Sequence, residues 1–377
     1  MVPPATHTTP TLQSLSVPSP VPDDLTRYHR QTMLAGVGRE GQARLLAAHV
    51  AIVGVGALGT VAADLLARAG VGRLTLIDRD VVERTNLQRQ TLFTERDARE
   101  GRPKAVAAAE RLREANADIR IEPVPTDLVA TNALDVLDRA QFGPPDLVLD
   151  GTDNFTTRYI LNDACVQSRR PLVYGGAVAW GGSQMTVIPG ETACLRCIHP
   201  EPPAPGETET CDSVGVFAPV SAIVASVQAG EALRLLLGLR RPGSGSLLRF
   251  DLDAGRRSRL DAAELRDPDC PCCAHRRFEF LDGSRTTGDG ATLCGRLAVQ
   301  VAPLANTRTD LTRLAARLAP HGDFRATPYT VRGRLAERPA GFEADCELTI
   351  FADGRAIVGG TERADLARSV YARFVGV

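Results

Sequence analysis

The sequence lacks the features that mark a membrane-spanning, secreted or nucleic-acid-binding protein. Its formal net charge is only −1 over 377 residues, so it carries no basic field on the scale that nucleic-acid binding requires. No apolar run approaches the roughly 20 residues of a membrane-spanning helix. The N-terminus has no basic stretch followed by an apolar one, as a signal peptide would. We therefore expect a cytoplasmic protein that binds neither membranes nor nucleic acids.

Lysine is rare, although lysine and arginine together number 44. The nine cysteines are an odd number and cluster in pairs, which in a non-secreted chain favours metal or thiol chemistry over disulfides. The chain is long enough for a large core and two domains. Its hydrophobic content of 44% is ordinary for a globular protein.

Strand-like and helix-like stretches alternate from residue 50 to about residue 190. The first expected strand, Val50–Val53, is a short continuous apolar run, as in a parallel sheet covered on both faces. Further strands are expected at Arg73–Asp78, Ile119–Val124, Asp146–Asp150 and Pro171–Tyr174. Between them, helical spacing covers Ala57–Arg68, Lys104–Leu112 and residues 154–169. This βαβ rhythm predicts the α/β class, with a Rossmann-like open sheet.

The remaining segments predict the domain organisation. Residues 1–26 are rich in proline and form a disordered tail. The main domain covers residues 27–280 and contains a Pro-rich, acidic mobile loop at 200–214, followed by a long apolar helix over Val216–Leu237 that Pro242 stops. Residues 281–291 read as a linker.

Residues 292–377 predict a separate small α+β domain of the order βαββα. A strand is expected at Leu297–Val301, a helix at Asp310–Leu318 and a second strand at Tyr329–Leu335. Cys346–Phe351 and Ala356–Val358 are expected to form a hairpin. An Asp353-Gly354 turn joins the last two strands. A final helix places Leu366, Val370, Tyr371 and Phe374 on one face. No function can be assigned to this domain from its sequence beyond packing or docking.

A glycine turn follows the first predicted strand. Gly54, Gly56 and Gly59 form a G-x-G-x-x-G pattern, in which glycines let the backbone approach a nucleotide and the helix N-terminus offers N–H groups to anions. Asp78 ends the next strand, where a carboxylate can accept both ribose hydroxyls, and Asp80 supports it. The motif alone does not separate NAD from ATP, and a turn needed only for packing is a further alternative.

A cluster of amide and basic side chains downstream of the turn favours ATP. Asn86, Gln88, Arg89 and Lys104 look suited to hold a triphosphate and its transition state. Arginine offers a planar fork for phosphate oxygens and lysine a compact charge. Nucleotidyl transfer depends on such positioning and neutralisation. Because lysine is rare and Lys104 begins a helix after Pro103, we favour this function over a surface role.

Asp153 lies just past the end of a predicted strand, in GTDN (151–154). Ligands bind at the carboxyl ends of parallel strands in open α/β sheets, and a carboxylate beside phosphates suits Mg²⁺. The alternative is a structural role, because Thr152, Asp153 or Asn154 would each cap the following helix.

Two cysteine pairs predict a zinc site. CLRC (194–197) and CPCC (270–273) each contain C-x-x-C, and two such pairs supply four thiolates in the tetrahedral set typical of structural zinc. Cys272 is an extra thiol that could substitute, and redox chemistry is the rival for a single pair. The expected ligands are Cys194, Cys197, Cys270 and Cys273.

Cys211 stands alone before the long apolar helix. A thiol near a helix start can have a lowered pKa and act as a nucleophile, although a spectator role is the alternative. Cys165 falls in an apolar helix and reads as core, and Cys294 and Cys346 carry no signal.

Taken in order, these motifs resemble the MoeB/ThiF/HesA adenylyltransferases, which are relatives of the ubiquitin-activating enzymes. The resemblance covers about residues 27–280 and rests on RYHRQ (27–31), GVGALG (54–59), LIDRD (76–80), NLQRQTLF (86–93), GRPK (101–104), GTDN (151–154), CLRC, TCDSVGVFAP (210–219) and CPCC.

The resemblance implies that ATP binds with Mg²⁺ and that a ubiquitin-like sulfur carrier protein presents its C-terminal Gly-Gly. The carrier's carboxylate attacks the α-phosphate, and a sulfur donor later converts the acyl-adenylate to a thiocarboxylate. Gly56 and Asp78 would hold adenosine, Arg89 and Lys104 the phosphates, and Asp153 the Mg²⁺ or α-phosphate.

The resemblance further implies a homodimer, in which Arg30 reaches into the partner subunit's site. The four cysteines would bind Zn²⁺, and Cys211 would take up carrier or sulfur, as in some relatives. Residues 292–377 show no rhodanese-like loop, so sulfur would come from a separate cysteine desulfurase or sulfurtransferase. The rival interpretations are an NAD-dependent oxidoreductase, a non-catalytic zinc scaffold of the same fold, and an RNA-modifying cyclase within the family.

Overall fold

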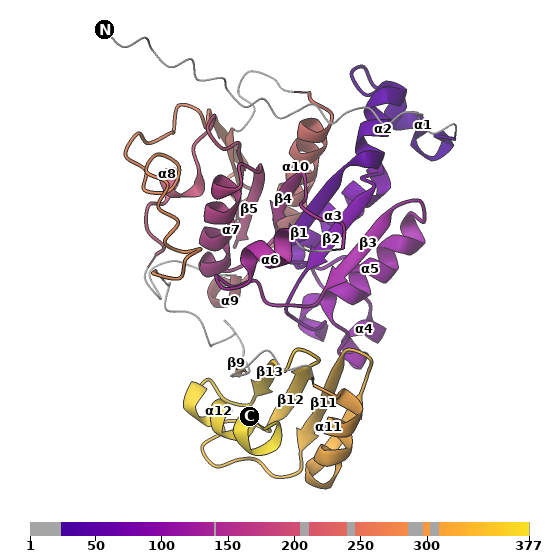
Figure 1. Ribbon diagram of the computed structural model, residues 1–377, viewed down its shortest axis with the longest axis vertical. Helices are drawn as coiled ribbons and strands as arrows, with labels where there is room; N and C mark the ends of the chain where they lie inside the picture. Colours follow the sequence, from indigo (N-terminus) through magenta and orange to yellow (C-terminus); the bar gives the residue numbers. More distant parts are fainter. Residues whose placement is uncertain are drawn as a thin grey trace.

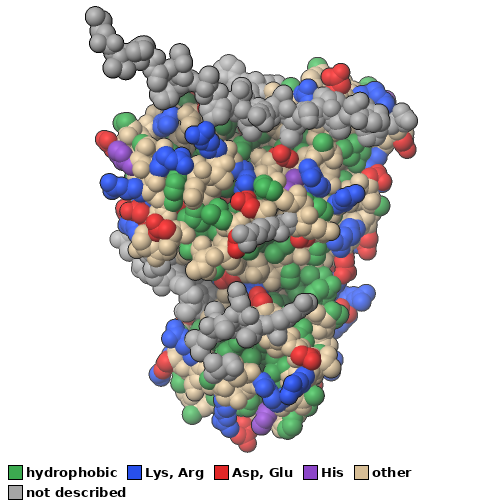
Figure 2. Space-filling model, viewed as in Figure 1, with side chains coloured by type: hydrophobic (Ala, Val, Ile, Leu, Met, Phe, Trp, Pro, Cys, Tyr) green, Lys and Arg blue, Asp and Glu red, His purple; other side chains and the backbone are tan. Residues whose placement is uncertain are grey.

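The computed structural model describes residues 24–138, 141–203, 211–239, 246–285, 297–301 and 309–376. They form two sheets with helices of their own (Figure 1). Acidic and basic side chains are interspersed over the face shown in Figure 2, in keeping with the small net charge. Across the described ranges, no helix is both long and apolar enough to cross a membrane.

The larger sheet has eight strands in the order β3-β2-β1-β4-β5-β6-β7-β8. The first five strands in this order, β3, β2, β1, β4 and β5, run parallel to one another. Strands β6, β7 and β8 follow, each antiparallel to its neighbour. The bounds are β1 (His49–Val53), β2 (Arg73–Ile77), β3 (Arg120–Val124), β4 (Leu147–Asp150), β5 (Leu172–Val178), β6 (Gly181–Val187), β7 (Leu247–Asp251) and β8 (Arg256–Leu260). The predicted α/β open sheet is confirmed, but the sequence analysis did not identify its three antiparallel strands.

Helices cover both faces of this sheet (Figure 1). One core packs against α2 (Gly38–Ala47), α3 (Ala57–Ala69), α5 (Lys104–Ala115) and α10 (Ala218–Leu236). The other packs against α6 (Ala133–Asp138), α7 (Phe155–Gln167) and α8 (Leu195–Ile198). Shorter helices are α1 (His29–Thr32), α4 (Glu95–Glu100) and α9 (Cys211–Val214). All five residues of β1 are buried, as its continuous apolar run predicts.

Two predictions about residues 200–242 need correction. The segment expected to be a loop at 200–214 ends in α9, which begins at Cys211. The long helix α10 ends at Leu236, and Gly238 follows with φ of 71°. Glycine takes this left-handed backbone without strain, so the helix ends well before Pro242, which lies outside the described residues.

The smaller sheet is antiparallel throughout, in the order β10-β11-β12-β13-β9. Its strands are β9 (Ala298–Val301), β10 (Gly322–Ala326), β11 (Thr330–Leu335), β12 (Glu347–Phe351) and β13 (Ala356–Gly359), with helices α11 (Leu311–Leu318) and α12 (Ala364–Phe374). We call residues 297–301 and 309–376 the C-terminal unit.

The C-terminal unit departs from the predicted βαββα order. The predicted ranges hold four strands, one more than that order counts, and β10 is a fifth that was missed, so the observed order is βαββββα. The predicted hairpin is confirmed, because β12 and β13 pair antiparallel around Asp353-Gly354. In α12, Val370 and Tyr371 are buried in the core of the unit, as expected from the helical spacing. The boundaries between tail, main domain, linker and C-terminal domain stay a prediction, since residues 1–23 and 286–296 are outside the described ranges.

Candidate nucleotide site and zinc centre

A cavity of about 1220 Å³ opens at the carboxyl ends of β1, β2 and β4 and continues over β5 to β8. Strands β2 and β4 lie on opposite sides of β1, so the strand order reverses there. In open α/β sheets this reversal leaves a crevice that binds ligands. The volume exceeds the range of about 300–1000 Å³ usual for one small ligand. The cavity therefore has room for a nucleotide and part of a second substrate.

The glycine turn forms one wall of this cavity. Gly54 has φ of 84°, and a Cβ on it would lie 2.7 Å from the backbone of Gly151, so packing excludes a side chain there. A Cβ on Gly59 would lie 1.9 Å from the carbonyl oxygen of Gly54. Gly56 differs, because a Cβ on it would meet only the side-chain nitrogen of Gln90, at 3.7 Å, which is an ordinary contact distance. The space beside Gly56 belongs to the cavity, which favours a ligand over packing alone as the reason for that glycine.

Asp78 fixes the turn that it faces. Its Oδ2 accepts a hydrogen bond from the Val55 amide and its Oδ1 one from the Asp80 amide, both at 2.7 Å. Burial raises the pKa of the Asp78 carboxyl, while Lys104 and the two amide donors oppose that rise. The carboxylate is 9% exposed and lines the cavity, where its remaining lone pairs can meet a ribose.

Lys104 is the only lysine in the sequence. Its Nζ lies 3.1 Å from Oδ2 of Asp80, and the residue is 5% exposed at the start of α5. Both residues line the cavity. An ammonium group held in this way inside a cleft attracts phosphate strongly, because little water screens it.

The cluster downstream of the turn divides into two parts. Arg89 lines the cavity, and its guanidinium donates to the carbonyl of Thr85 at 3.0 Å. Asn86 is buried and accepts from the Glu83 amide at 2.9 Å, closing a capping box. Gln88 is exposed. Neither Asn86 nor Gln88 lines the cavity, so the structure brings only Arg89 and Lys104 of this set to it.

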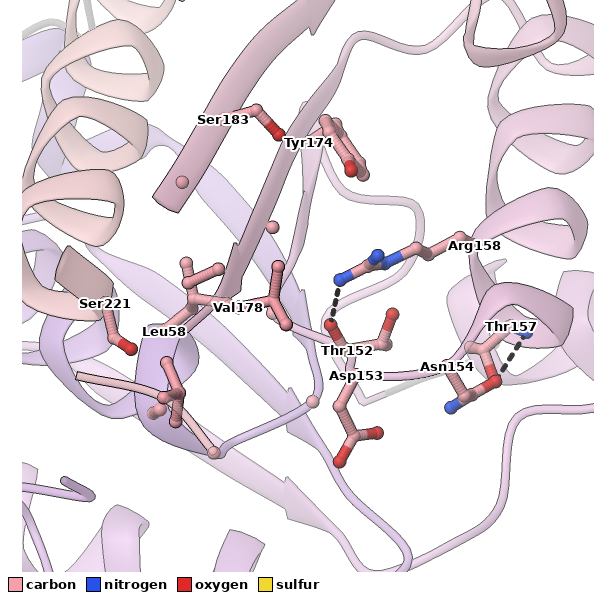
Figure 3. Close-up of a pocket in the computed structure, with 18 of the residues that line it drawn as sticks. Leu58, Thr152, Asp153, Asn154, Thr157, Arg158, Tyr174, Val178, Ser183 and Ser221 are labelled. Atoms are coloured by element: carbon pink, nitrogen blue, oxygen red, sulfur yellow. Dashed lines mark hydrogen bonds between the residues drawn. The ribbon is translucent and has the colours of Figure 1, made fainter. Parts of the chain in front are cut away.

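The positions of Asp153 and Asn154 show which of the two residues caps the helix after GTDN and which faces the cavity. Asn154 caps α7, since its side chain accepts from the Thr157 amide at 2.9 Å. Asp153 is exposed, lines the cavity and points into it (Figure 3). Because Asn154 supplies the cap, the carboxylate of Asp153 stays available to a cation or phosphate.

Arg158 is a cavity residue that sequence reasoning missed. It donates to the Thr152 carbonyl at 2.7 Å, and its guanidinium lies over the Tyr174 ring at 5.3 Å (Figure 3). It approaches the buried Asp150 at 3.8 Å. No spacing signal marks it, because it is one of many arginines in the chain and lies in a helix of mixed polar and apolar residues. Its position just after GTDN was the only available sign.

Two buried polar atoms in the cavity wall have no partner among the described residues. They are Oε1 of Gln90 and Oγ of Ser221, and both residues line the cavity. Ser221 projects from α10 toward it (Figure 3). Buried polar groups are almost always hydrogen-bonded, so these two atoms indicate a polar ligand.

The two C-x-x-C pairs meet in space, as predicted. The sulfurs of Cys194, Cys197, Cys270 and Cys273 all lie within 4.8 Å of one another. Individual Sγ–Sγ distances are 3.6 Å for Cys194–Cys270 and 3.4 Å for Cys197–Cys273. Sulfurs bound tetrahedrally to one zinc at about 2.3 Å lie about 3.8 Å apart. The residues therefore fit a structural zinc ion.

Cys272 faces a different neighbour. Its sulfur accepts a hydrogen bond from Nδ2 of Asn162 at 3.3 Å, and it is outside the four-sulfur cluster. Asn162 also receives the Leu195 amide at 2.8 Å. The geometry thus favours Cys273 over Cys272 as the fourth ligand. The described cysteines are free of disulfides.

Arg30 is not among the described residues that line the cavity of its own chain. The RYHRQ motif is anchored by Tyr28, which accepts from Asn116 at 2.9 Å, and by Gln31, which donates to Gln42 at 2.7 Å. Arg30 itself is exposed. Cys211 begins α9, a few residues before Val216 at the cavity wall.

Comparison with known proteins places this site in context. A model of the ThiF family matches residues 28–272. The chain is 39% identical over 351 residues to the Sulfur carrier protein ThiS adenylyltransferase of Bacillus subtilis, covering 93% of this chain and 99% of that protein. It is 43% identical over 258 residues to the Sulfur carrier protein adenylyltransferase of Thermus thermophilus, covering 67% and 91% respectively.

Among solved structures, that of E. coli MccB with MccA-N7isoASN superposes with a TM-score of 0.58 at 23% identity, covering 68% of this chain and 77% of that one. This likeness supports the fold. The two sequence relatives are named as adenylyltransferases, which disfavours the oxidoreductase interpretation.

Proposed function

The chain belongs to the ThiF family, and from that premise we propose that it uses ATP to adenylate the C-terminal glycine carboxylate of a ubiquitin-like sulfur carrier protein. It is an adenylyltransferase, as its relatives are named. The observation that carries the proposal is the match to a carrier adenylyltransferase over nearly that protein's whole length. The cavity with its glycine turn, cations and carboxylates supplies the chemistry.

The reaction is a displacement at the α-phosphate. A carboxylate oxygen of the carrier forms a bond to the α-phosphorus, the bond from that phosphorus to the bridging oxygen of the β-phosphate breaks, and pyrophosphate leaves with the electron pair. The attacking and attacked groups are both anionic, so cations must lower their repulsion. Lys104 and Arg89 line the cavity where this charge would lie, and we assign them to the phosphates.

Mg²⁺ would neutralise further charge on the triphosphate. Asp153 offers the exposed carboxylate that points into the cavity, and carboxylates with phosphate oxygens are the usual ligands of this ion. Asp78 would accept the ribose hydroxyls beside Gly56, where the wall leaves space.

The carrier would enter over the antiparallel strands. The cavity continues along Arg249, Phe250 and Arg257 of β7 and β8. Trp180 is 49% exposed beside it and stacks on Phe217 with ring centroids 4.3 Å apart. Exposed aromatic groups next to basic ones are suited to a protein partner, and the cavity is long enough to admit a glycine-ended tail.

Zn²⁺ would be structural here. Four thiolates leave no open coordination position for a substrate. Bound by the four cysteines, the ion would join α8 to the segment at 270–273, which lie 76 positions apart in the chain. Free, clustered thiols of this kind persist in the reducing cytoplasm, where we place the enzyme.

In a homodimer, Arg30 of one subunit would reach the nucleotide cavity of the other. Arg30 is exposed on α1 and followed by Met33 and Leu34, which are 64% and 60% exposed. Adjacent exposed apolar side chains of this size favour a covered surface. We infer that this corner packs on a second copy, whose cavity receives the Arg30 guanidinium.

Sulfur would come from a separate donor. Its sulfur attacks the carbonyl carbon of the acyl-adenylate, the bond to the phosphate oxygen breaks, and AMP leaves. Cys211 is our candidate for holding the carrier or the sulfur in between, since it begins a helix close in sequence to the cavity residue Val216.

The test is ATP–pyrophosphate exchange by the purified protein, with and without a small carrier ending in Gly-Gly. Exchange that requires the carrier is the expected result, and a carrier with its last glycine removed is the matched control. Exchange without any carrier, or none with any carrier in protein that binds ATP, would contradict the proposal and favour a small-molecule or RNA carboxylate or a scaffold role.

A further inference from the structure

The C-terminal unit contacts the rim of the nucleotide cavity through a buried arginine. Arg355 is 6% exposed and lies in the turn between β12 and β13. Its Nη2 donates to the carbonyl of Pro125 at 2.9 Å, and its Nη1 to the carbonyl of Arg79 at 3.4 Å. Pro125 follows β3 and Arg79 follows β2. One guanidinium therefore joins the two loops that leave the carboxyl ends of these strands.

The turn that carries Arg355 is itself held on several sides. Asp353 accepts from Nε of Arg355 at 2.7 Å, and the guanidinium lies 4.6 Å from the centroid of the Phe351 ring. Tyr371 of α12 donates its hydroxyl to the carbonyl of Gly354 at 2.8 Å. The side chain of Arg355 is held by an ion pair and an aromatic ring, on a turn that Tyr371 fixes, and it has little rotamer freedom left. Arg355 thus presents its donors from a fixed position.

Gln300 of β9 makes a second contact with the same rim. Its Nε2 donates to Oδ2 of Asp127 at 2.6 Å. The other oxygen of that carboxylate, Oδ1, lies 3.5 Å from Nη1 of Arg79. Asp127 is therefore held between an amide from the C-terminal unit and a guanidinium from the main sheet. Both Asp127 and Arg79 line the nucleotide cavity.

Arg79 is, with Lys104, one of two cations beside the aspartates of that cavity. It interacts with the carboxylates of Asp127, Asp80, Asp153 and Asp78. Burial by itself would lower the pKa of Arg79, but these four carboxylates, Asp127 foremost, raise it above its usual range. A polyanionic nucleotide entering among so many carboxylates meets repulsion unless a fixed cation offsets it. The position of Arg79 should therefore affect nucleotide affinity.

We propose that Gln300 and Arg355 are positioning residues for nucleotide binding: the C-terminal unit uses them to hold Asp127 and the loop of Arg79 in the arrangement that accepts ATP. The inference rests on the proposed function, because it concerns the same cavity. It assigns to this unit a task that its own sequence does not reveal. Gln300 and Arg355 are not among the residues that line the cavity, and they would act through Asp127 and Arg79.

The relatives indicate that this task is an addition to the shared chemistry. The matched segment of the Thermus protein takes up 91% of that protein but only 67% of this chain, so a unit of this size has no counterpart there. The Bacillus protein is matched over 99% of its length by 351 residues, which reach into the C-terminal unit. Nucleotide binding that depends on Gln300 and Arg355 is thus expected here and not throughout the family.

The experiment measures binding of an ATP analogue with a methylene group between the α- and β-phosphates, by calorimetry, on the full-length protein. Arg355→Ala and Gln300→Leu should each raise its Kd roughly three- to tenfold, as the loss of one or two hydrogen bonds implies. In exchange assays the KM for ATP should rise likewise, while the KM for the carrier changes less than about twofold. Arg355→Lys should give an intermediate Kd, since it keeps the charge but not the fork.

Arg363→Ala is the matched control. Arg363 belongs to the same unit, is exposed and pairs with Asp365, and its loss should leave the Kd unchanged. Circular dichroism and melting curves show whether each variant folds, and Gln300→Leu leaves the β12–β13 turn intact. A wild-type Kd in folded Arg355→Ala and Gln300→Leu would overturn the proposal. Absence of nucleotide binding in the wild type would instead overturn the adenylylation itself.

Discussion

Asp153 and Asn154 are neighbours in the chain with separate tasks in the structure. Asn154 accepts the Thr157 amide and caps α7, whereas Asp153 points into the cavity (Figure 3). Their sequence allowed either residue to be the cap, because aspartate and asparagine are about equally good at that position. The side-chain direction that separates them depends on how β4 delivers the chain to the helix.

For this single residue we predict the effect of Asp153→Ala. Carrier-dependent exchange should fall on the order of 100-fold or more, because a group that offsets charge at the reacting phosphate is lost. The melting temperature should stay within a few degrees of wild type, since exposed residues away from caps change stability by about 0.5 kcal/mol or less. Both quantities can be measured on one preparation.

Asn154→Ala is the control for this prediction. It removes the cap and should lower stability by about 1 kcal/mol, while the carboxylate of Asp153 remains. Wild-type exchange in a folded Asp153→Ala protein would rule out the role assigned to that residue.

Among the elements, the four-cysteine cluster brings together two parts of the main domain that are far apart in the chain. Cys194 caps the start of α8 and Cys197 lies within it, and the segment at 270–273 supplies the other two sulfurs. Arg196, between the first pair, is 1% exposed and forms an ion pair with Glu279 at 2.8 Å. The local chain there has few regular hydrogen bonds, so a metal ion would contribute much of its stability.

We predict that Cys194→Ala and Cys273→Ala release zinc and lower the melting temperature, because three thiolates bind the ion far more weakly than four. Cys272→Ala is the matched control. Cys272 lies in the same segment and is buried but is outside the cluster, so this variant should keep its zinc. Metal content is read by elemental analysis of purified protein. Equal zinc in Cys194→Ala and wild type would remove the ligand assignment.

Elements were predicted well where an apolar pattern marked them and poorly where none did. Strands β1, β2 and β4 are mainly apolar and almost wholly buried between helices. Strand β3, RIEPV, lies at the sheet edge and is only partly buried. Strand β8 reads RRSRL and all five residues are exposed, so its sequence offers no strand signal. It forms because β7 supplies a paired edge. Strand β10, with Gly322 and Arg325, is an edge strand of the same kind.

For the whole molecule, the assembly prediction concerns Arg30 and Lys104. If Arg30 of one protomer completes the site of its partner, Arg30→Ala and Lys104→Ala should each be inactive as homodimers. A heterodimer of the two, purified through two different tags after co-expression, contains one complete site and should show roughly half of the wild-type exchange rate per dimer.

A heterodimer as inactive as its parents would show that Arg30 and Lys104 do not act across an interface. Arg39→Ala is the control, because Arg39 is exposed on α2 and its loss removes a nearby positive charge without removing Arg30. Paired with Lys104→Ala, it should also give about half activity, because it leaves Arg30 in place.

The sequence by itself determined the chemistry that is encoded over short distances. A glycine turn, a carboxylate at a strand end and a C-x-x-C pair each lie within a few residues, and backbone geometry fixes what they can do. That was enough to predict the open sheet, the nucleotide turn and a four-thiolate site. The arginine-rich strands and Arg158 carry no such local pattern.

The tertiary structure decided everything that depends on residues far apart in the chain. It selected Cys273 over Cys272, because Asn162 takes up Cys272 from another helix. It gave the cap to Asn154 and placed Asp153 in the lining of the cavity. It also placed Gln300 and Arg355 against a loop about 200 positions earlier. Contacts of this kind arise only when separate cores pack together, and no periodicity within one segment encodes them.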